Sequence, residues 1–152
     1  METLFRQGLF YIILNYVILC KANIKHVEHI MPILEIELVA SGSTPSLPAD
    51  LTQSLAEASA QVFDAPPGTV WVKLQVIPLT QYAENGGMPE GVYPVFVTVL
   101  KSRIPEGSVL ETEIAQLTKV IAGALNRSET NVHVFYQPDG AGRVAFGGKL
   151  VK

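Results

Sequence analysis

The sequence is poor in cysteine, histidine and basic residues, and each shortage excludes a class of protein. A single cysteine in 152 residues excludes a disulfide framework and any zinc site built from cysteines. Three histidines provide few ligands for a metal site. Lysine and arginine number 11 against 14 acidic residues, so no basic stripe can follow the phosphates of a nucleic acid. We therefore expect no metal and no nucleic-acid partner.

Proline is missing from residues 1–30, although ten prolines follow from Pro32 onward. The apolar run at residues 8–20 is shorter than the roughly 20 residues that span a bilayer, and no clear signal-peptide cleavage site follows it. Because Met31-Pro32 is typical of a translation start, we expect residues 1–31 to be an extension that is absent from the mature protein. A retained helical extension and a targeting segment are the alternatives. Without a targeting or spanning segment, we expect a cytoplasmic protein with no membrane partner.

The rest of the chain is rich in apolar residues arranged with clear periodicity. Hydrophobic residues make up 48% of the chain, which is too many for disorder. Residues 33–40 form a β-branched and aliphatic run typical of a buried strand. An apolar stripe at Leu51, Leu55, Ala58 and Val62 predicts a helix, with Pro48 in its first turn and Ser46 as a possible cap. Alternation over 69–77 predicts a second strand.

The same order of elements then repeats about 62 residues later. Strands are predicted at 93–101 and 131–136, on either side of a helix that Ser108 and Glu111 open as a capping box. An apolar stripe marks this second helix: Leu110, Ile114, Leu117, Ile121 and Leu125. Two consecutive β-α-β units favour an α+β fold, with a four-stranded mixed sheet and both helices on one face. The other face needs a cover, which oligomerisation would provide.

Met31-Pro32-Ile33, at the head of this duplicated layout, resembles the start of proteins in the tautomerase superfamily, which includes 4-oxalocrotonate tautomerase and macrophage migration inhibitory factor. The turn at 63–66 and the Gly-Gly pairs resemble the short subunits, whereas the fused length and residues 97–103 and 145–151 resemble the longer members. The resemblance implies one tautomerase-like domain over 32–152, made of repeats at about 32–90 and 93–152. It also implies a homotrimer without a cofactor that isomerises a small α-keto or enol acid.

In that superfamily the general base is the amino-terminal proline, which corresponds to Pro32. A free α-amino group has a reference pKa of about 7.7–8, and burial among apolar side chains disfavours its charged form. A base with a pKa near the working pH moves protons efficiently. Because an acylated nitrogen is an amide without a basic lone pair, this role requires removal of residues 1–31.

The carboxylate of such a substrate needs a cation. Arg103 aligns with a carboxylate-binding arginine of the superfamily, and Lys101 lies on the same side if the strand continues that far. Lys73, on the Trp71 side of its strand, is a further candidate for the pocket or for a seam between subunits. For each of them, the alternative is a solvated cation.

Three further residues are placed in the pocket by the resemblance. His133 occupies the position of a pocket tyrosine contributed by a neighbouring subunit, and a neutral histidine can hydrogen-bond a substrate oxygen there. Phe146 resembles a pocket phenylalanine, and Trp71 replaces an arginine and would form a second apolar wall. The alternative for His133 is a satisfied interface histidine, and the alternative for Phe146 is simple packing.

Two other functions stay open at this stage. A catalytically silent structural or binding homologue is expected if residues 1–31 are retained. A lyase like malonate semialdehyde decarboxylase needs an acidic residue to activate water, and Thr69 and Ala145 stand at the matching positions. Neither of them can act as an acid or base, so isomerisation is the favoured chemistry.

Overall fold

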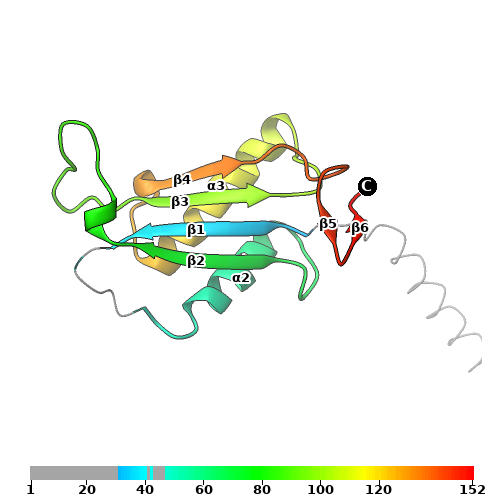
Figure 1. Ribbon diagram of the computed structural model, residues 1–152, viewed down its shortest axis with the longest axis horizontal. Coiled ribbons are helices and arrows are strands. Elements are labelled where there is room, and N and C mark those ends of the chain that lie inside the picture. The colour runs from blue at the N-terminus through cyan, green and yellow to red at the C-terminus, as the bar shows by residue number, and fades with distance from the viewer. Residues whose placement is uncertain (1–30, 41, 43–46) are drawn as a thin grey trace, which may run out of the picture.

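The computed structural model describes residues 31–40, 42 and 47–152, so the extension 1–30 and the candidate cap Ser46 lie outside the described residues. The first repeat and the second repeat each form a strand, a helix and a strand (Figure 1). These elements are β1 (Ile33–Val39), α2 (Leu51–Val62), β2 (Trp71–Ile77), β3 (Val95–Leu100), α3 (Gly107–Leu125) and β4 (Val132–Tyr136). Short 3-10 turns, η2 (Leu79–Gln81) and η3 (Glu129–Asn131), follow β2 and precede β4.

The four long strands form one mixed sheet in the order β2-β1-β3-β4. Within each repeat the strands are parallel, whereas β1 and β3 are antiparallel at the centre, where Ile33 lies opposite Leu100. Both helices lie behind the sheet in Figure 1, on one face. The predicted four-stranded mixed sheet with two helices on one face is therefore confirmed.

A separate two-stranded hairpin, which the sequence did not predict, ends the chain. It consists of β5 (Ala145–Phe146) and β6 (Lys149–Leu150), paired antiparallel. Gly147 and Gly148 form its turn with φ values of 55° and 79°, which glycine adopts without the steric cost of a Cβ. In Figure 1 the hairpin lies where β1 begins and β3 ends.

The core lies between the sheet and the helices, and strand alternation fills it. Every second residue of β1 and β3 is buried there: Leu34, Ile36, Leu38, Val95, Val97 and Val99. The helices contribute Leu55, Leu117 and Ile121, which are fully buried. Removing each such side chain from water stabilises the fold by roughly 1.5–3 kcal/mol. The two apolar helix stripes thus produce the layered packing that the sequence predicts.

The predicted N-terminal starts of both helices are wrong by a few residues or in their caps. Helix α2 begins at Leu51, not at Pro48, because residues 48–51 form a turn in which the Leu51 amide donates to the Pro48 carbonyl at 3.1 Å. Helix α3 begins at Gly107, whose φ is 56°. Ser108 is therefore already inside the first turn, and α3 has no side-chain cap. The predicted capping box does not form.

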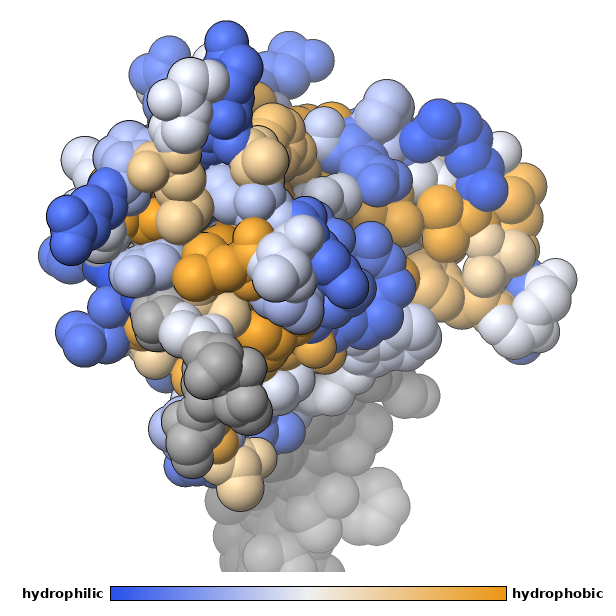
Figure 2. Space-filling view, turned by 60° about the vertical axis from the view of Figure 1, so that its left-hand side comes forward, coloured by the Kyte–Doolittle hydropathy of each residue, from blue (hydrophilic) through white to orange (hydrophobic). Residues whose placement is uncertain are grey.

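The face of the sheet away from the helices is mixed in character. It carries exposed apolar side chains such as Trp71 and Phe135, together with Glu35, which is ion-paired to Lys73. Figure 2 shows a similar mixture at the end of the molecule on the left of Figure 1, where hydrophilic side chains interrupt apolar patches. No helix in the described part of the chain combines the length and hydrophobicity of a bilayer-spanning segment.

Candidate active site

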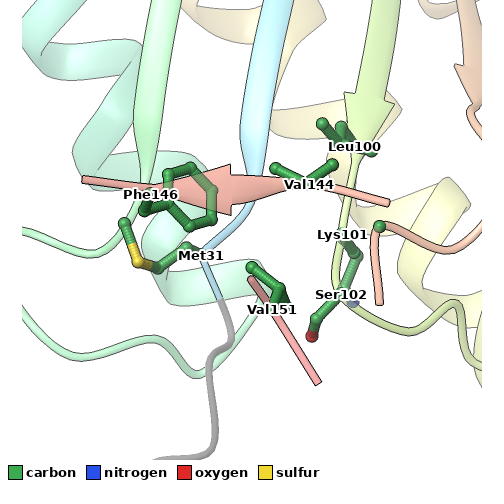
Figure 3. A pocket seen from close by; sticks show the side chains of 8 residues that line it. Met31, Leu100, Lys101, Ser102, Val144, Phe146 and Val151 are labelled. Carbon is green, nitrogen blue, oxygen red and sulfur yellow. The ribbon is translucent and has the colours of Figure 1, made fainter. Parts of the chain in front are cut away.

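A narrow pocket lies where β1 begins; its enclosed cavity measures only about 10 Å³, and the empty space of about 210 Å³ around it includes open solvent. Three segments distant in sequence converge there: Met31, two residues before β1; the end of β3; and the C-terminal segment that includes β5 (Figure 3). The lining consists of Met31, Leu100, Lys101, Ser102, Gly140, Val144, Phe146 and Val151. The lining is mostly apolar, and Lys101 is its one charged residue.

Pro32 follows the lining residue Met31 in the chain and is fixed by the sheet, but it does not itself line the pocket. Its side chain is fully buried, and its carbonyl accepts a hydrogen bond of 3.0 Å from the Trp71 amide, which extends the pairing of β1 with β2. The Pro32 nitrogen is bonded to the carbonyl carbon of Met31, which itself lines the pocket. The Pro32 nitrogen is therefore one bond away from a residue that lines the pocket, and in the full chain it is an amide nitrogen.

Lys101 lines the pocket, but its charge is already paired. The strand ends at Leu100, and Lys101 turns to the helix side, where only 8% of it is exposed. Its ammonium donates to both carboxylate oxygens of Glu113 at 2.8 and 2.6 Å and lies 4.8 Å from the centre of the Phe63 ring. A substrate carboxylate at Lys101 would therefore also meet the negative charge of Glu113.

Glu113 is the residue of this site that sequence reasoning missed. It comes from α3, and its Oε1 also accepts a hydrogen bond of 2.7 Å from the Tyr136 hydroxyl. Burial raises the pKa of Tyr136, and the hydrogen bond to Glu113 raises it further, so Tyr136 remains a donor across the neutral range. The available signal was a charged residue between Leu110 and Leu117 on an otherwise apolar helix stripe.

Phe146 and Trp71 come together at one wall of the pocket. Their rings make an edge-to-face contact with centroids 5.3 Å apart, a favoured aromatic geometry. Phe146 is itself part of the lining, whereas Trp71 is 44% exposed behind it. The structure thus places these two predicted pocket residues side by side.

The other predicted pocket residues lie elsewhere in the described chain. Arg103 is exposed beyond the end of β3 and does not line the pocket, because the strand that was expected to carry it stops at Leu100. Lys73 is paired with Glu35 on the open sheet face. His133 stacks on Phe96 of the neighbouring strand, with ring centroids 5.6 Å apart. Within one described chain, none of these three side chains reaches the pocket.

The connection between β4 and β5 closes the pocket from the β3 side. Gly140 donates its amide to the Lys101 carbonyl at 2.8 Å, and Ala141 donates to the Ser102 carbonyl at 3.0 Å. A Cβ on Gly140 would lie 3.0 Å from the Lys101 carbonyl oxygen, so any other residue would need the connection to shift by a few tenths of an ångström. Among the described residues, no group of three His, Cys, Asp or Glu side chains is placed to hold a metal ion.

Comparison with solved structures decides the fold family. A fused 4-OT wild-type symmetric trimer matches with a TM-score of 0.63 at 19% identity, covering 78% of this chain and 94% of that one. Pt0534 inactivated by 2-oxo-3-pentynoate matches with a TM-score of 0.62 at 20% identity, covering 78% and 96%. This is the tautomerase-superfamily fold.

A third structure with this fold extends the match to the second branch of the superfamily. Macrophage migration inhibitory factor from Trichinella spiralis has a TM-score of 0.59 at 16% identity, with 78% of this chain and 98% of that chain covered. No family model matches the sequence, and no curated protein matches it. The predicted resemblance is therefore confirmed at the level of the fold, including its fused, two-repeat form.

Proposed function

We propose that the chain, once it begins at Pro32, is a cofactor-independent tautomerase of a small α-keto or enol acid and assembles as a homotrimer. The observation that carries this proposal is the position of Pro32: its nitrogen adjoins an apolar pocket through Met31, which lines that pocket. Removing Met31 would vacate space in the pocket and convert the Pro32 nitrogen into a secondary amine. Trimers among the similar solved structures support the proposed assembly.

In the proposed reaction, Pro32 moves one proton between two atoms of the substrate. Its nitrogen takes the hydroxyl proton of the enol and returns a proton to the carbon next to the hydroxyl-bearing carbon. The C–O bond becomes C=O as the C=C bond becomes single, so that atoms balance and the enzyme is regenerated. Leu100, Val144, Phe146 and Val151 make the pocket next to this nitrogen apolar. Such surroundings disfavour the protonated amine and leave its lone pair free at neutral pH. Arg103, Lys73 and a neighbouring subunit's His133 remain candidate contacts for the substrate carboxylate, and Lys101 becomes one only if its pairing with Glu113 is broken.

The enol–keto conversion of phenylpyruvate tests this function. The form beginning at Pro32 is expected to catalyse it, whereas the full chain, with an amide at Pro32, is expected to be at least about 10²-fold slower. In the shortened form, Pro32→Ala should lower kcat/KM at least about tenfold, because the ring that fixes the nitrogen is lost.

Pro89→Ala, in an exposed loop, is the matched control and should keep the activity of the form that begins at Pro32. An inactive Pro32 form, or full activity after Pro32→Ala, would overturn the proposal. Intact-mass measurement of the protein purified from its natural source then shows which form exists there.

A catalytically silent homologue is the second candidate, and two observations favour it. Met31 occupies part of the pocket, and Lys101 is paired with Glu113. A natural mass that includes Met31 would select this function. A decarboxylase-like lyase ranks lower, because the described pocket lining contains no acidic side chain to activate water. Formation of acetaldehyde from malonate semialdehyde would select the lyase.

A further inference from the structure

The Lys101–Glu113 ion pair separates two hollows of the molecule. Lys101 lines the pocket at Pro32, whereas Glu113 lines a groove on the helix side between α2 and α3. We infer that Glu113 is a specificity-determining residue: by neutralising Lys101, it makes the pocket accept a monocarboxylate with an apolar tail and reject a second carboxylate. This deepens the proposed function, because it names the class of acid for the same pocket.

The first step of the argument is the geometry of the pair. Both oxygens of Glu113 contact the ammonium, and the two side chains are only 9% and 12% exposed. A carboxylate that approached Lys101 would lose its hydration and feel attraction and repulsion from charges less than 3 Å apart. The desolvation cost of burying that carboxylate would then have no matching gain.

The second step is the chemistry of the remaining lining. Leu100, Val144, Phe146 and Val151 offer apolar surface, and among the described lining residues only Ser102 adds an uncharged polar side chain. Such a surface favours an aryl or alkyl tail. A substrate with charges at both ends would have to place one of them against these side chains or against the neutralised lysine.

The third step is the rigidity of the pair. The Tyr136 hydroxyl, on β4, donates to Glu113, on α3, at 2.7 Å. Tyr136 therefore holds the Glu113 carboxylate in the position where it pairs with Lys101, which follows β3. Side chains from three elements thus hold the pair in one arrangement. Glu113 and Tyr136 are positioning residues, since both act on a ligand through Lys101.

Ligand binding tests this inference without depending on turnover. The matched probes are 3-phenylpropanoate and 3-(4-carboxyphenyl)propanoate, which differ by one carboxylate at the far end of the ring. Trp71 is the only tryptophan of the chain and contacts Phe146, so its fluorescence reports binding. The main core cluster of the described residues lies within 34–132, so the form beginning at Pro32 keeps it. Binding is measured on this form, because Met31 lines the pocket in the full chain.

We expect the protein to bind the monoacid at least about tenfold more tightly than the diacid. Glu113→Gln frees Lys101 and should shift this ratio at least about tenfold towards the diacid, whose second carboxylate can then pair with Lys101. The monoacid could reach Lys101 only by turning end for end, and its ring would then lose its burial in the apolar part of the pocket. Glu111→Gln, on the exposed side of α3, removes the same charge and should shift the ratio by less than about twofold.

If Glu113→Gln does not fold, the double variant Lys101→Gln/Glu113→Gln replaces it with a neutral pair. This variant should keep the ratio of the unchanged protein to within about threefold, because the original pair is also neutral. The inference is overturned if the unchanged protein binds the diacid as tightly as the monoacid, if Glu113→Gln shifts the ratio no more than Glu111→Gln, or if the double variant changes it more than threefold. If the protein does not turn over phenylpyruvate, only the proposed function is contradicted, because the ratio of the affinities for the monoacid and the diacid is measured by binding.

Discussion

At the scale of single residues, the pocket depends on which groups are already paired. Pro32 is held by a backbone hydrogen bond to Trp71, and Lys101 is held by Glu113. Tyr136 completes this set with its hydroxyl on Glu113. A partly buried tyrosine that donates to a carboxylate resists ionisation, because the phenolate would be both less solvated and next to a negative charge.

The raised pKa of Tyr136 predicts how stability depends on pH. The phenol titrates near 10 in the unfolded chain and higher in the folded one, so its contribution is fully present below pH 10 and is lost as the pH rises above it. The difference in unfolding free energy between the unchanged protein and Tyr136→Phe should therefore fall by about 1.4 kcal/mol between pH 8 and pH 11. Urea unfolding at each pH measures it.

Tyr93→Phe is the control for this experiment, because Tyr93 lies in a loop, away from Glu113, beside the Arg127 guanidinium. A constant difference in Tyr136→Phe would show that Tyr136 ionises as easily in the folded protein as in the unfolded chain. The same fall in Tyr93→Phe would show that the effect does not come from the contact with Glu113.

At the scale of elements, the ends of strands and the segments that join them build the site. The end of β3 supplies Leu100 and leads to Lys101, and the β4–β5 connection lies against it through the Gly140 and Ala141 amides. Hairpin β5–β6 then adds Phe146 to the wall. Because loops at strand ends are held by few contacts, one close approach can decide their position.

Gly140→Ala is expected to loosen this end of the molecule. Its Cβ would lie 3.0 Å from the Lys101 carbonyl oxygen and 3.3 Å from a Val144 methyl group, so the connection must move away from β3. We expect a loss of about 1–3 kcal/mol in the free energy of unfolding and lower kcat in the tautomerase assay. Denaturant titration and steady-state kinetics measure the two effects.

Gly123→Ala is the matched control, because a Cβ at this exposed position in α3 meets nothing within 4 Å. It should stabilise the protein by about 0.5–1 kcal/mol, since alanine loses less backbone entropy in a helix than glycine. Equal effects of the two substitutions would contradict the role given to the close approach at Gly140.

At the scale of the whole molecule, the two faces of the sheet differ. Both helices cover one face, and the other exposes Trp71 and Phe135 at 44% and 54%. That open face also carries charges, including the Lys73–Glu35 pair. A surface of this mixed kind fits an interface between subunits better than it fits the interior of a single chain.

The proposed trimer gives a prediction at this scale. Sedimentation equilibrium of the form beginning at Pro32 should give three times the mass of that form, which is smaller than the 16.5 kDa of all 152 residues. Phe135→Glu, on the open face, should weaken association at least about tenfold, because it places a charge in an apolar contact. Val109→Glu changes a side chain on α3 that is 62% exposed and should leave the mass unchanged. A monomer at all concentrations, or equal effects of the two substitutions, would contradict a trimer built through the open sheet face.

The sequence by itself determined the elements and their order, because strand alternation and helix stripes are local patterns that recur after about 62 residues. It also placed Phe146 and Trp71 near the pocket through the resemblance. It misplaced the helix starts, where Gly107 and the turn after Pro48 compete with the caps that were expected. It also expected Lys101 and Arg103 to act together, although the strand ends before either of them.

Only the tertiary structure decided which charges meet. Lys101, Glu113 and Tyr136 come from the end of β3, from α3 and from β4, and no spacing along the chain reveals that they share one buried site. Phe146 reaches Trp71 only because the C-terminal hairpin folds back over the start of β1. Periodicity is a property of neighbouring residues, whereas the charge of a pocket depends on side chains that the packing of distant elements brings together.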